Sequence, residues 1–464
     1  MTVPDWVQDS VFYQIFPDRF ANGDFNNDPA NQLSWDAAPT TKGFHGGDLR
    51  GIIQKFDYLL DLGINAIYLN PIFLASTNHR YNTTDYFQID PKLGDLQDFH
   101  ALLDLAHHHS VRVVLDGVFN HCGRGFFAFN DILENQDQSP YKDWFHILKF
   151  PVDAYSPGDA EDYLGWWKLK SLPKLNTDYL PVRKYILKVA QYWIEQGADG
   201  WRLDVPNEID DDYFWADFRQ TVLAVNRDAY ILGEIWDANP RWVGEGHFDG
   251  LMNYPVRDAL LGLLTAKLPV SQFADKVEKL LTLYPRENVY AMYVPIGTHD
   301  TPRLLTLMEG DLKKVKLSFM FQFAFPGAPA IYYGDEIGLP GKKDPDNRRT
   351  FPWDPTAWNV ELRGYVQELV ALRKRLPVLR RGDFNRVLAD DTRGIYVFTR
   401  CLGDEKLMVV MNTSATRRNV RIPVGDLGWK DGLIVLNLLE NGEYLVSGDD
   451  LALTINPMTG MCLK

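Results

Sequence analysis

The sequence predicts an α/β protein whose main part is a (β/α)8 TIM barrel. Short apolar, β-branched runs alternate with amphipathic helical patterns from about Val11 to Leu379, and this alternation is typical of a parallel sheet whose strands are joined by helices. Eight such runs occur, which is the strand number of this barrel. The chain of 464 residues is also longer than one core normally supports, so a smaller appendage is expected.

The predicted barrel strands are short, mostly apolar runs. They cover residues 11–16, 66–70, 111–116, 200–205, 230–234, 250–253, 294–298 and 330–333. Before the fourth strand, apolar residues recur at helical spacing from Val182 to Ile194, after Pro181 and before Gly197. This segment is expected to be a barrel helix that buries one face.

Two segments depart from the alternation. Residues 122–177 are rich in aromatic, Gly and Pro residues without regular periodicity, and a loop of that length favours a small inserted subdomain after the third strand. Residues 382–464 contain alternating runs at 395–399, 407–411, 420–424, 433–436 and 451–455, which predict an antiparallel β-sandwich domain. The barrel itself is then expected to comprise residues 1–121 and 178–381.

Composition excludes several classes of partner. The formal net charge of −14 argues against nucleic acid, which requires clustered Lys and Arg. No apolar run approaches the length of a membrane span, and the first residues lack the pattern of a signal peptide. The three cysteines, Cys122, Cys401 and Cys462, build neither a disulfide framework nor a zinc site. We therefore expect a cytoplasmic protein, either a monomer or a homodimer.

The run Gly200–Asp204 places Arg202 and Asp204 on the same side of the predicted fourth strand. A neighbouring arginine favours the ionised form of a carboxyl, so Arg202 is expected to keep Asp204 charged. A positioned, ionised carboxylate can act as a nucleophile. A structural ion pair is the alternative interpretation of these two residues alone.

Polar residues follow three further predicted strands. Residues 116–121 follow the third strand, Glu234 ends the fifth, and His299 with Asp300 follows the seventh. Because the carboxyl ends of barrel strands meet at one mouth, these side chains are expected to form a single site with Arg202 and Asp204.

These four blocks resemble the signature regions of the alpha-amylase family, glycoside hydrolase family 13, and the resemblance covers nearly the whole chain. Residues 171–177 and 205–208 further resemble the subgroup of neopullulanases, cyclomaltodextrinases and maltogenic amylases. Members of this subgroup often carry an additional N-terminal β domain, which this chain is expected to lack.

The resemblance implies a retaining hydrolase of α-1,4-glucosidic bonds in maltooligosaccharides, cyclodextrins, pullulan or starch, with possible α-1,6 cleavage and transglycosylation and without an organic cofactor. A glucanotransferase or debranching enzyme of the same family is the nearest alternative. A non-catalytic glycan-binding or scaffold barrel is a distant one, because it would be expected to have lost the acidic residues.

The resemblance also implies residue roles. Asp204 is the nucleophile, Glu234 the general acid and base, and Asp300 the carboxylate that holds sugar hydroxyls. Retention would require the first two carboxyls to stand about 5 to 5.5 Å apart. The substrate-binding residues that the resemblance implies, including the Arg202 that flanks the nucleophile, are Tyr81, His121, Arg202, His299, Asn207, Glu208, Trp236, Asp344 and Arg348. Asp116 and Asn120 are expected to support the site from beneath.

A second polar cluster lies near the N-terminus. Asn22, Asp24, Asn27 and Asp28 crowd oxygen ligands into a short turn, which suits calcium, although turn chemistry alone also selects Asn, Asp and Gly. The resemblance adds Gly46 and Asp48 to this set and implies a structural Ca2+ site away from the catalytic centre.

Overall fold

The computed structural model describes residues 3–464, and its central sheet contains eight parallel strands. Their order is β8-β7-β6-β5-β2-β1-β10-β9. A parallel bridge between Met252, just after β8, and Tyr293 of β9 joins the two ends of this order and closes the barrel. The strands are β1 (Phe12–Ile15), β2 (Ala66–Leu69), β5 (Arg112–Gly117), β6 (Gly200–Leu203), β7 (Tyr230–Gly233), β8 (Gly250–Leu251), β9 (Tyr293–Pro295) and β10 (Ala328–Tyr332).

All eight strands coincide with predicted ones, and the fold class is confirmed. Every residue of the described barrel strands except Arg112 is buried, which explains why they are continuous apolar runs rather than alternating ones. Aromatic and aliphatic side chains such as Phe12, Tyr68 and Tyr230 fill the barrel interior as one cluster.

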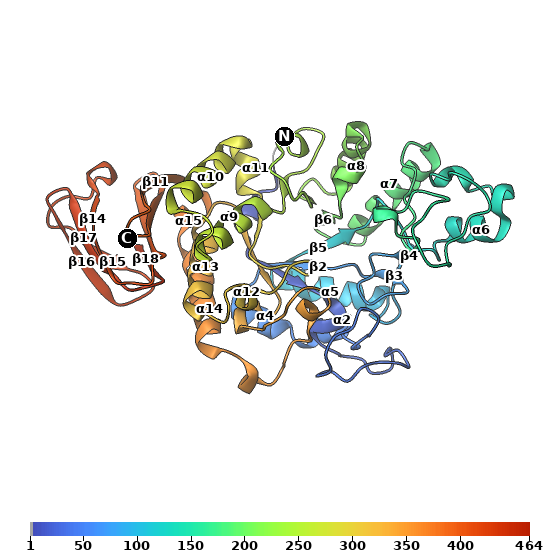
Figure 1. The fold of residues 1–464 in the computed structure, drawn as a ribbon, viewed down its shortest axis with the longest axis horizontal. Helices are drawn as coiled ribbons and strands as arrows, with labels where there is room; N and C mark the ends of the chain where they lie inside the picture. Colours follow the sequence, from blue (N-terminus) through green and yellow to red (C-terminus); the bar gives the residue numbers. More distant parts are fainter. Residues whose placement is uncertain (1–2) are drawn as a thin grey trace.

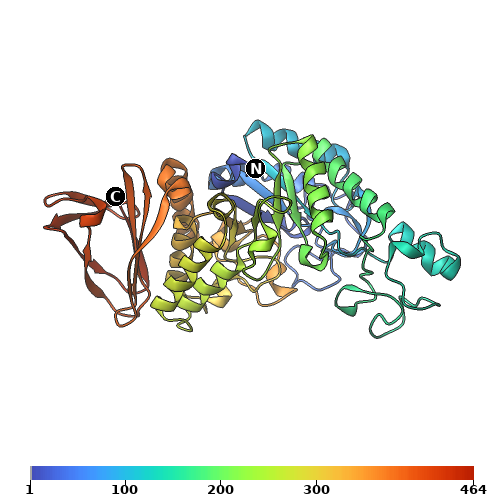
Figure 2. The ribbon, with the colours of Figure 1, turned by 90° about the horizontal axis from the view of Figure 1, so that it is seen from above.

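Helices surround the barrel, as Figures 1 and 2 show. The helix predicted between residues 182 and 194 is α7 (Leu180–Glu195), which has Pro181 in its first turn and is followed by Gly197 at φ 105°. The other helices are α1 (Asp5–Gln8), α2 (Pro17–Phe20), α3 (Leu49–Gln54), α4 (Phe56–Leu62), α5 (Leu96–His108), α8 (Asp212–Val225), α9 (Tyr254–Leu264), α10 (Val270–Leu283), α11 (Arg286–Tyr290), α12 (Leu304–Leu307), α13 (Leu312–Ala324), α14 (Val360–Arg375) and α15 (Pro377–Arg381).

The segment between β5 and α7 contains little regular structure. It holds α6 (Phe127–Asn135) and the 3-10 turns η1 (Gln136–Gln138), η2 (Lys142–Trp144) and η3 (Trp166–Lys168). Isolated bridges, including His121 with Lys174 and Gly165 with Pro173, tie it together. A short antiparallel pair, β3 (Phe73–Ala75) and β4 (Thr83–Ile89), lies beside it at one end of the molecule, opposite the C-terminal sheet (Figure 1).

The C-terminal region is an antiparallel sheet of eight strands in the order β11-β12-β13-β18-β15-β16-β17-β14. Its two halves enclose one apolar core, since Ile395 and Val410 of one half share a buried cluster with Ile422 and Leu453 of the other. The strands are β11 (Asp383–Asp390), β12 (Ile395–Leu402), β13 (Glu405–Asn412), β14 (Arg418–Pro423), β15 (Ile434–Asn437), β16 (Gly442–Ser447), β17 (Asp450–Ile455) and β18 (Thr459–Leu463).

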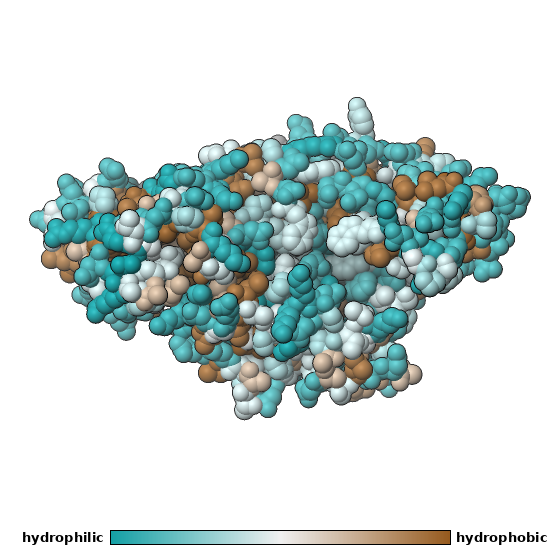
Figure 3. All heavy atoms as spheres, viewed as in Figure 1, coloured by the Kyte–Doolittle hydropathy of each residue, from teal (hydrophilic) through white to brown (hydrophobic). Residues whose placement is uncertain are grey.

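The face of the molecule in Figure 3 is predominantly polar. On the face shown in Figure 3, hydrophobic residues form separate small groups among hydrophilic ones. Within residues 3–464, no helix combines the length and the apolar character that a membrane span requires.

Candidate active site

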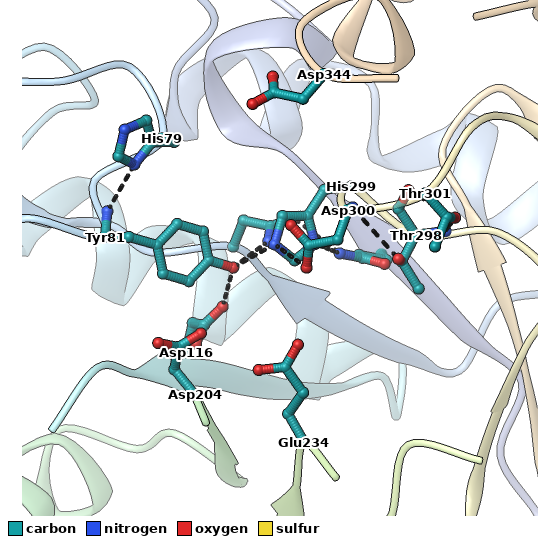
Figure 4. Close-up of polar contacts among 12 residues, drawn as sticks. His79, Tyr81, Asp116, Asp204, Glu234, Thr298, His299, Asp300, Thr301 and Asp344 are labelled. Atoms are coloured by element: carbon teal, nitrogen blue, oxygen red, sulfur yellow. Dashed lines mark hydrogen bonds and ion pairs between the residues drawn. The ribbon is translucent and has the colours of Figure 1, made fainter. Parts of the chain in front are cut away.

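The carboxyl ends of β5, β6, β7 and β9 bring acidic side chains to one mouth of the barrel. Asp116 lies on β5, Asp204 and Glu234 directly follow β6 and β7, and Asp300 lies in the turn after β9. Figure 4 shows the carboxyl groups of Asp204, Glu234 and Asp300 turned toward one shared space, with Asp116 beside Asp204. The predicted convergence of these residues is therefore present.

Arg202 is the centre of this group. It is fully buried, and β5 pairs it laterally with Asp116. Its Nη1 donates to Asp116 Oδ1 at 2.8 Å and to Asp204 Oδ1 at 2.9 Å, while its Nη2 lies 2.9 Å from Glu234 Oε1. One guanidinium therefore contacts three carboxyl groups and fixes their relative positions. Asp116 supports Arg202, as expected.

Burial and Arg202 act on the pKa of Asp204 in opposite directions. Burial raises the pKa of Asp204 well above its ordinary value; Arg202 lowers it, and the Glu234 and Asp116 carboxylates raise it further. Arg202 therefore favours the ionised form of Asp204, but burial and the neighbouring carboxylates oppose it, because one cation is shared among three carboxyls. Burial in this pocket raises the pKa values of its carboxyls, so at least one of them tends to keep its proton.

Glu234 has the pKa of a general acid at neutral pH. Burial is the main cause that raises its pKa to about 7, and the negative charge of Asp300 adds to this effect, while Arg202 opposes it. The backbone N–H of Val205 donates to Glu234 Oε2 at 3.0 Å. Val205 has φ 36°, a left-handed conformation that is costly for a β-branched residue and that typically marks a functional site.

Tyr81 and His299 form one wall of the pocket. Their rings stack at 5.4 Å with an interplanar angle of 6°. The Tyr81 hydroxyl donates to Asp116 Oδ2 at 2.9 Å and lies 2.5 Å from His299 Nε2. Gln14 Nε2 contacts His299 Nδ1 at 2.8 Å, and because this amide nitrogen can only donate, the His299 proton is on Nε2. Burial lowers the His299 pKa well below its ordinary value, so the ring is neutral.

His121 occupies another position beside the pocket. It is fully buried, and burial lowers its pKa to about 3. Its Nδ1 contacts Asn120 Nδ2 at 3.2 Å, whereas its Nε2 has no hydrogen-bond partner in the described part of the chain. A buried neutral imidazole nitrogen without a partner is available to a ligand hydroxyl.

Arg348 holds the loop that carries Asp300. Its Nε donates to the His299 carbonyl at 3.0 Å, and its Nη2 lies 3.4 Å from Asp300 Oδ1. Asp344 contacts the same guanidinium at 3.3 Å but stands apart from the other carboxyls in Figure 4. The Asp300 side chain remains 31% exposed, and Arg348 partly offsets the rise in its pKa that burial causes.

The remaining predicted substrate residues follow the carboxyl ends of β6 and β7. Trp236 is 45% exposed and stacks on the buried Tyr254 at 3.8 Å. Asn207 and Glu208 belong to η4 (Pro206–Glu208) directly after Val205. Glu208 is engaged by Lys174 Nζ, at 2.8 Å through its carbonyl and 3.4 Å through its carboxylate. Trp236 and Asn207 are exposed, unlike the buried Asp204 and Glu234 that they follow in the chain.

We call residues 22–28 together with 46–48 the Asn/Asp loop. Asp28 Oδ1 accepts from Asn22 Nδ2 at 2.8 Å. Asp48 caps α3 and accepts four hydrogen bonds, including one from Asn27 Nδ2 at 3.2 Å. Gly46 has φ 82°, and a Cβ there would meet Asp28 Oδ1 at 2.2 Å.

The Asn/Asp loop has a donor set that fits a hard cation. The side-chain oxygens of Asn22 and Asn27 are buried and unpartnered in residues 3–464, and unpaired amide oxygens beside carboxylates are ligands that calcium accepts. No group of three or more His, Cys, Asp or Glu side chains among these residues is itself arranged as a metal site. A calcium ion would therefore depend on the amide and carbonyl oxygens.

Sequence reasoning missed three residues that shape the pocket. Gln14 sets the His299 tautomer, His79 stacks beside Tyr81 at 5.9 Å, and Trp166 stacks on His121 at 5.2 Å. Gln14 was detectable as the polar residue within an apolar strand. The two stacking contacts depend on loop conformation, which carries no periodic signal.

A hollow of about 630 Å3 lies at the other end of the barrel, where Asp5, Asp228 and Glu287 line it close to the strands' amino ends. Chemistry in this fold takes place at the carboxyl ends of the strands. We therefore assign the site to the pocket around Arg202 rather than to this hollow.

The barrel and its pocket of buried carboxyls are those of a glycoside hydrolase, and comparison with known proteins identifies the family. The model described as alpha amylase, catalytic domain, matches residues 14–375. The chain is 46% identical to a cyclomaltodextrinase from Geobacillus thermopakistaniensis, over 98% of this chain and 76% of the relative. It is 42% identical to an intracellular maltogenic amylase from Bacillus subtilis, over 88% of this chain and 68% of the relative.

A solved structure agrees with these relatives. The cyclic α-maltosyl-(1→6)-maltose hydrolase from Arthrobacter globiformis, in complex with that sugar, matches the whole of both chains with a TM-score of 0.91 and 38% identity. The chain belongs to the alpha-amylase family, glycoside hydrolase family 13.

Proposed function

We propose that the protein is a retaining hydrolase of α-1,4-glucosidic bonds in maltooligosaccharides, cyclodextrins, pullulan or starch. The observation that carries the proposal is the sharing of one buried guanidinium by Asp204 and Glu234. It keeps two carboxyls in one pocket, where one can attack a sugar carbon while the other protonates the leaving oxygen.

The first step uses the proton that Glu234 holds near neutral pH. Glu234, whose pKa is about 7, donates its proton to the glycosidic oxygen as the bond to the anomeric carbon breaks. The Asp204 carboxylate forms a bond to that carbon, giving a covalent glycosyl-enzyme and a free sugar hydroxyl. Arg202 stabilises the ionised Asp204 that this step requires.

The second step reverses the proton transfer. The Glu234 carboxylate takes a proton from water, the water oxygen attacks the anomeric carbon, and Asp204 leaves as a carboxylate. Two inversions give net retention of configuration. The backbone N–H of Val205 stabilises the Glu234 anion that exists between the two steps.

The surrounding groups orient the sugar. Tyr81 and His299 offer a flat wall. The neutral, unpartnered Nε2 of His121 suits a sugar hydroxyl group. The carboxylate of Asp300 is held by Arg348 and can bind hydroxyls of the distorted sugar ring. We propose that Asn207, Glu208, Trp236 and Asp344 contact neighbouring sugar units.

The linkage preference is part of the proposal. The Arthrobacter hydrolase acts on a cyclic sugar named for its α-1,6 bonds, which supports α-1,6 cleavage as an additional activity here. A glucanotransferase or debranching enzyme is the second candidate, because an acceptor sugar in place of water would give transglycosylation with the same groups.

Three further statements stay predictions. We propose that the Asn/Asp loop binds a structural Ca2+ through Asn22, Asp24, Asn27, Asp28, the Gly46 carbonyl and Asp48, clamping two loops beside the barrel. The relative named intracellular supports a cytoplasmic location. The division into a barrel of residues 1–121 and 178–381, an insertion of 122–177 and a C-terminal domain of 382–464 also stays a prediction.

A product assay tests the proposal. The protein is incubated with maltotriose, β-cyclodextrin, pullulan and starch, and the anomer released first is read by NMR. We expect α-configured products from at least one α-1,4-linked substrate and none from Asp204→Asn. β-configured first products, or binding of all four sugars without turnover, would contradict the proposal; the latter would favour a non-catalytic barrel.

A further inference from the structure

Three rings stack in a row from the active-site pocket to the surface. The His121 ring, beside the pocket, stacks on Trp166 at 5.2 Å and 17°. Trp166 in turn stacks on Trp167 at 4.6 Å and 11°. Trp167 is 77% exposed, and Trp166 is the ring that contacts it among residues 3–464. One face of Trp167 is therefore covered and its other face is open.

The backbone holds Trp167 in this exposed position at a cost. Trp167 has φ 50° and ψ 30°, and Lys168 has φ 61°, a left-handed pair where glycine would be free of strain. The loop is fixed around them, since Trp166 N bonds to the Leu172 carbonyl at 2.9 Å and Ala160 N to the Lys168 carbonyl at 2.8 Å. The ring is thus held outward by a rigid loop.

We propose that the open face of Trp167 is a remote sugar subsite that stacks on a glucosyl unit of an α-glucan chain leaving the catalytic pocket past His121. A flat indole face complements the apolar C–H face of a pyranose ring, and such contacts need no charge. The inference rests on the proposed function, because it gives the same pocket a preference for longer chains.

A second copy of this chain is the competing occupant. Leu164 and Leu169 of the same loop are 44% and 45% exposed, so the loop has some apolar surface to offer. Continuity of the ring stack with the pocket favours the sugar, because a chain bound at the pocket has to emerge along its wall. Stable protein interfaces also bury far more surface than one loop presents.

The consequence is a dependence on chain length. A short substrate that fills only the pocket does not reach Trp167, so its kinetics are independent of this ring. A longer chain gains a stacking contact remote from the reacting bond. Such uniform binding lowers KM without changing kcat.

The test compares maltotriose with maltoheptaose in Trp167→Asn. Asparagine tolerates the left-handed backbone, so the substitution removes the ring while keeping the loop conformation. We expect KM for maltoheptaose to rise roughly 3- to 10-fold, with kcat and the KM for maltotriose unchanged. Trp167→Phe, which keeps a flat ring, should restore most of the loss. Tyr213→Ala removes an aromatic side chain that is 82% exposed on α8 and should change neither substrate.

Each contrary outcome has a distinct meaning. If Trp167→Asn changes neither substrate while the wild type turns over both, the subsite is wrong and the proposed function stands. An equal loss on both substrates would mean that the ring acts through His121, which also overturns the subsite. So would a change from dimer to monomer in sedimentation with an unchanged KM.

A binding measurement keeps the test independent of turnover. Calorimetric titration of maltoheptaose into Glu234→Gln, with and without Trp167→Asn, should show the same 3- to 10-fold weakening. Equal affinities would overturn the subsite whether or not the wild type is active.

Discussion

The catalytic pocket and the Asn/Asp loop both concentrate acidic groups, yet they balance their charge differently. In the pocket, Arg202 contacts three carboxyls at 2.8 to 2.9 Å. In the Asn/Asp loop, Asp24, Asp28 and Asp48 have no ion pair with any residue in 3–464, and two amide oxygens lack partners. The pocket carries its own cation, whereas the loop offers a place for an external one.

The carboxyls of the pocket are therefore held permanently by Arg202, whereas the Asn/Asp loop would be held only while a metal ion is bound. A covalently attached guanidinium is charged at all physiological pH values and fixes the carboxyls, but it is too little charge for all of them, so a proton is retained for catalysis. A metal ion can be removed, so the loop's contribution to stability should depend on its concentration. Substitutions in the two regions should therefore have different consequences.

Removing the internal cation should have the greatest effect. Arg202→Met leaves three carboxyls buried without a counter-charge, so the free energy of unfolding is expected to fall by about 3–5 kcal/mol. The kcat for maltotriose should fall roughly 1,000-fold. Urea unfolding and initial rates measure both. Arg241→Met is the control, because the ion pairs of Arg241 with Asp210 and Asp212 are exposed, and exposed ion pairs contribute little. An active, stable Arg202→Met protein would contradict the central role of this residue.

Removing the external cation should reduce stability alone. Calcium at about 100 times its Kd would add about 2.7 kcal/mol, so a chelator should lower the melting temperature while the pocket geometry, and hence activity below melting, is retained. Asp28→Asn should abolish the response, and Asp36→Asn, at an exposed aspartate nearby, should preserve it. Asp48 is unsuitable for this test because it also caps α3. Identical melting with calcium and chelator would remove the proposed site.

The proton held by Glu234 should make both the activity and the free energy of unfolding depend on pH. Since Glu234 must donate a proton, activity should decline as pH rises through about 7. Its raised pKa means that the folded protein loses stability between its ordinary pKa of 4.5 and about 7, by about 3 kcal/mol in total. Glu234→Gln should therefore be more stable than the wild type at pH 8 and similar at pH 4.5. Equal stability at both pH values would show that no such shift exists.

The strained backbone next to the nucleophile should give the smallest effect. Val205→Gly relieves the left-handed conformation but also frees the unfolded chain, so the free energy of unfolding should change by about 1 kcal/mol or less. The N–H that serves Glu234 is kept, and the activity limb near pH 7 should not move. A shift of that limb would mean that the valine side chain, rather than its amide, sets the pKa.

The sequence was sufficient for features that repeat or that lie at strand ends. Each barrel strand is a continuous apolar run bounded by polar residues, and Arg202 and Asp204 share a side because strand geometry requires it. The lateral pairing of Asp116 with Arg202 follows from adjacent parallel strands. Local strand geometry sets these features, so a single sequence is enough to predict them.

Other features depend on contacts between distant loops or on burial. The third contact of Arg202, with Glu234, and the raised pKa of Asp204 arise only once four strand ends close around a dry pocket. Strand β11 was missed because its residues are mostly half-exposed without alternation, and β16 and β18 were also missed. The conformations of Val205 and Trp167 have no sequence signature, since neither residue normally adopts positive φ.

The most direct test of the account is to trap the covalent intermediate. The protein is incubated with a 5-fluoroglucosyl fluoride, whose 5-fluoro substituent slows hydrolysis of the covalent intermediate. The protein is then digested, and the masses of its peptides are measured by mass spectrometry. We expect one added fluoroglucosyl unit on the peptide that contains Asp204. This unit should be lost on incubation with an acceptor sugar and absent in Asp204→Asn. A label on another residue, or turnover of the reagent with no covalent adduct and inverted product, would contradict it.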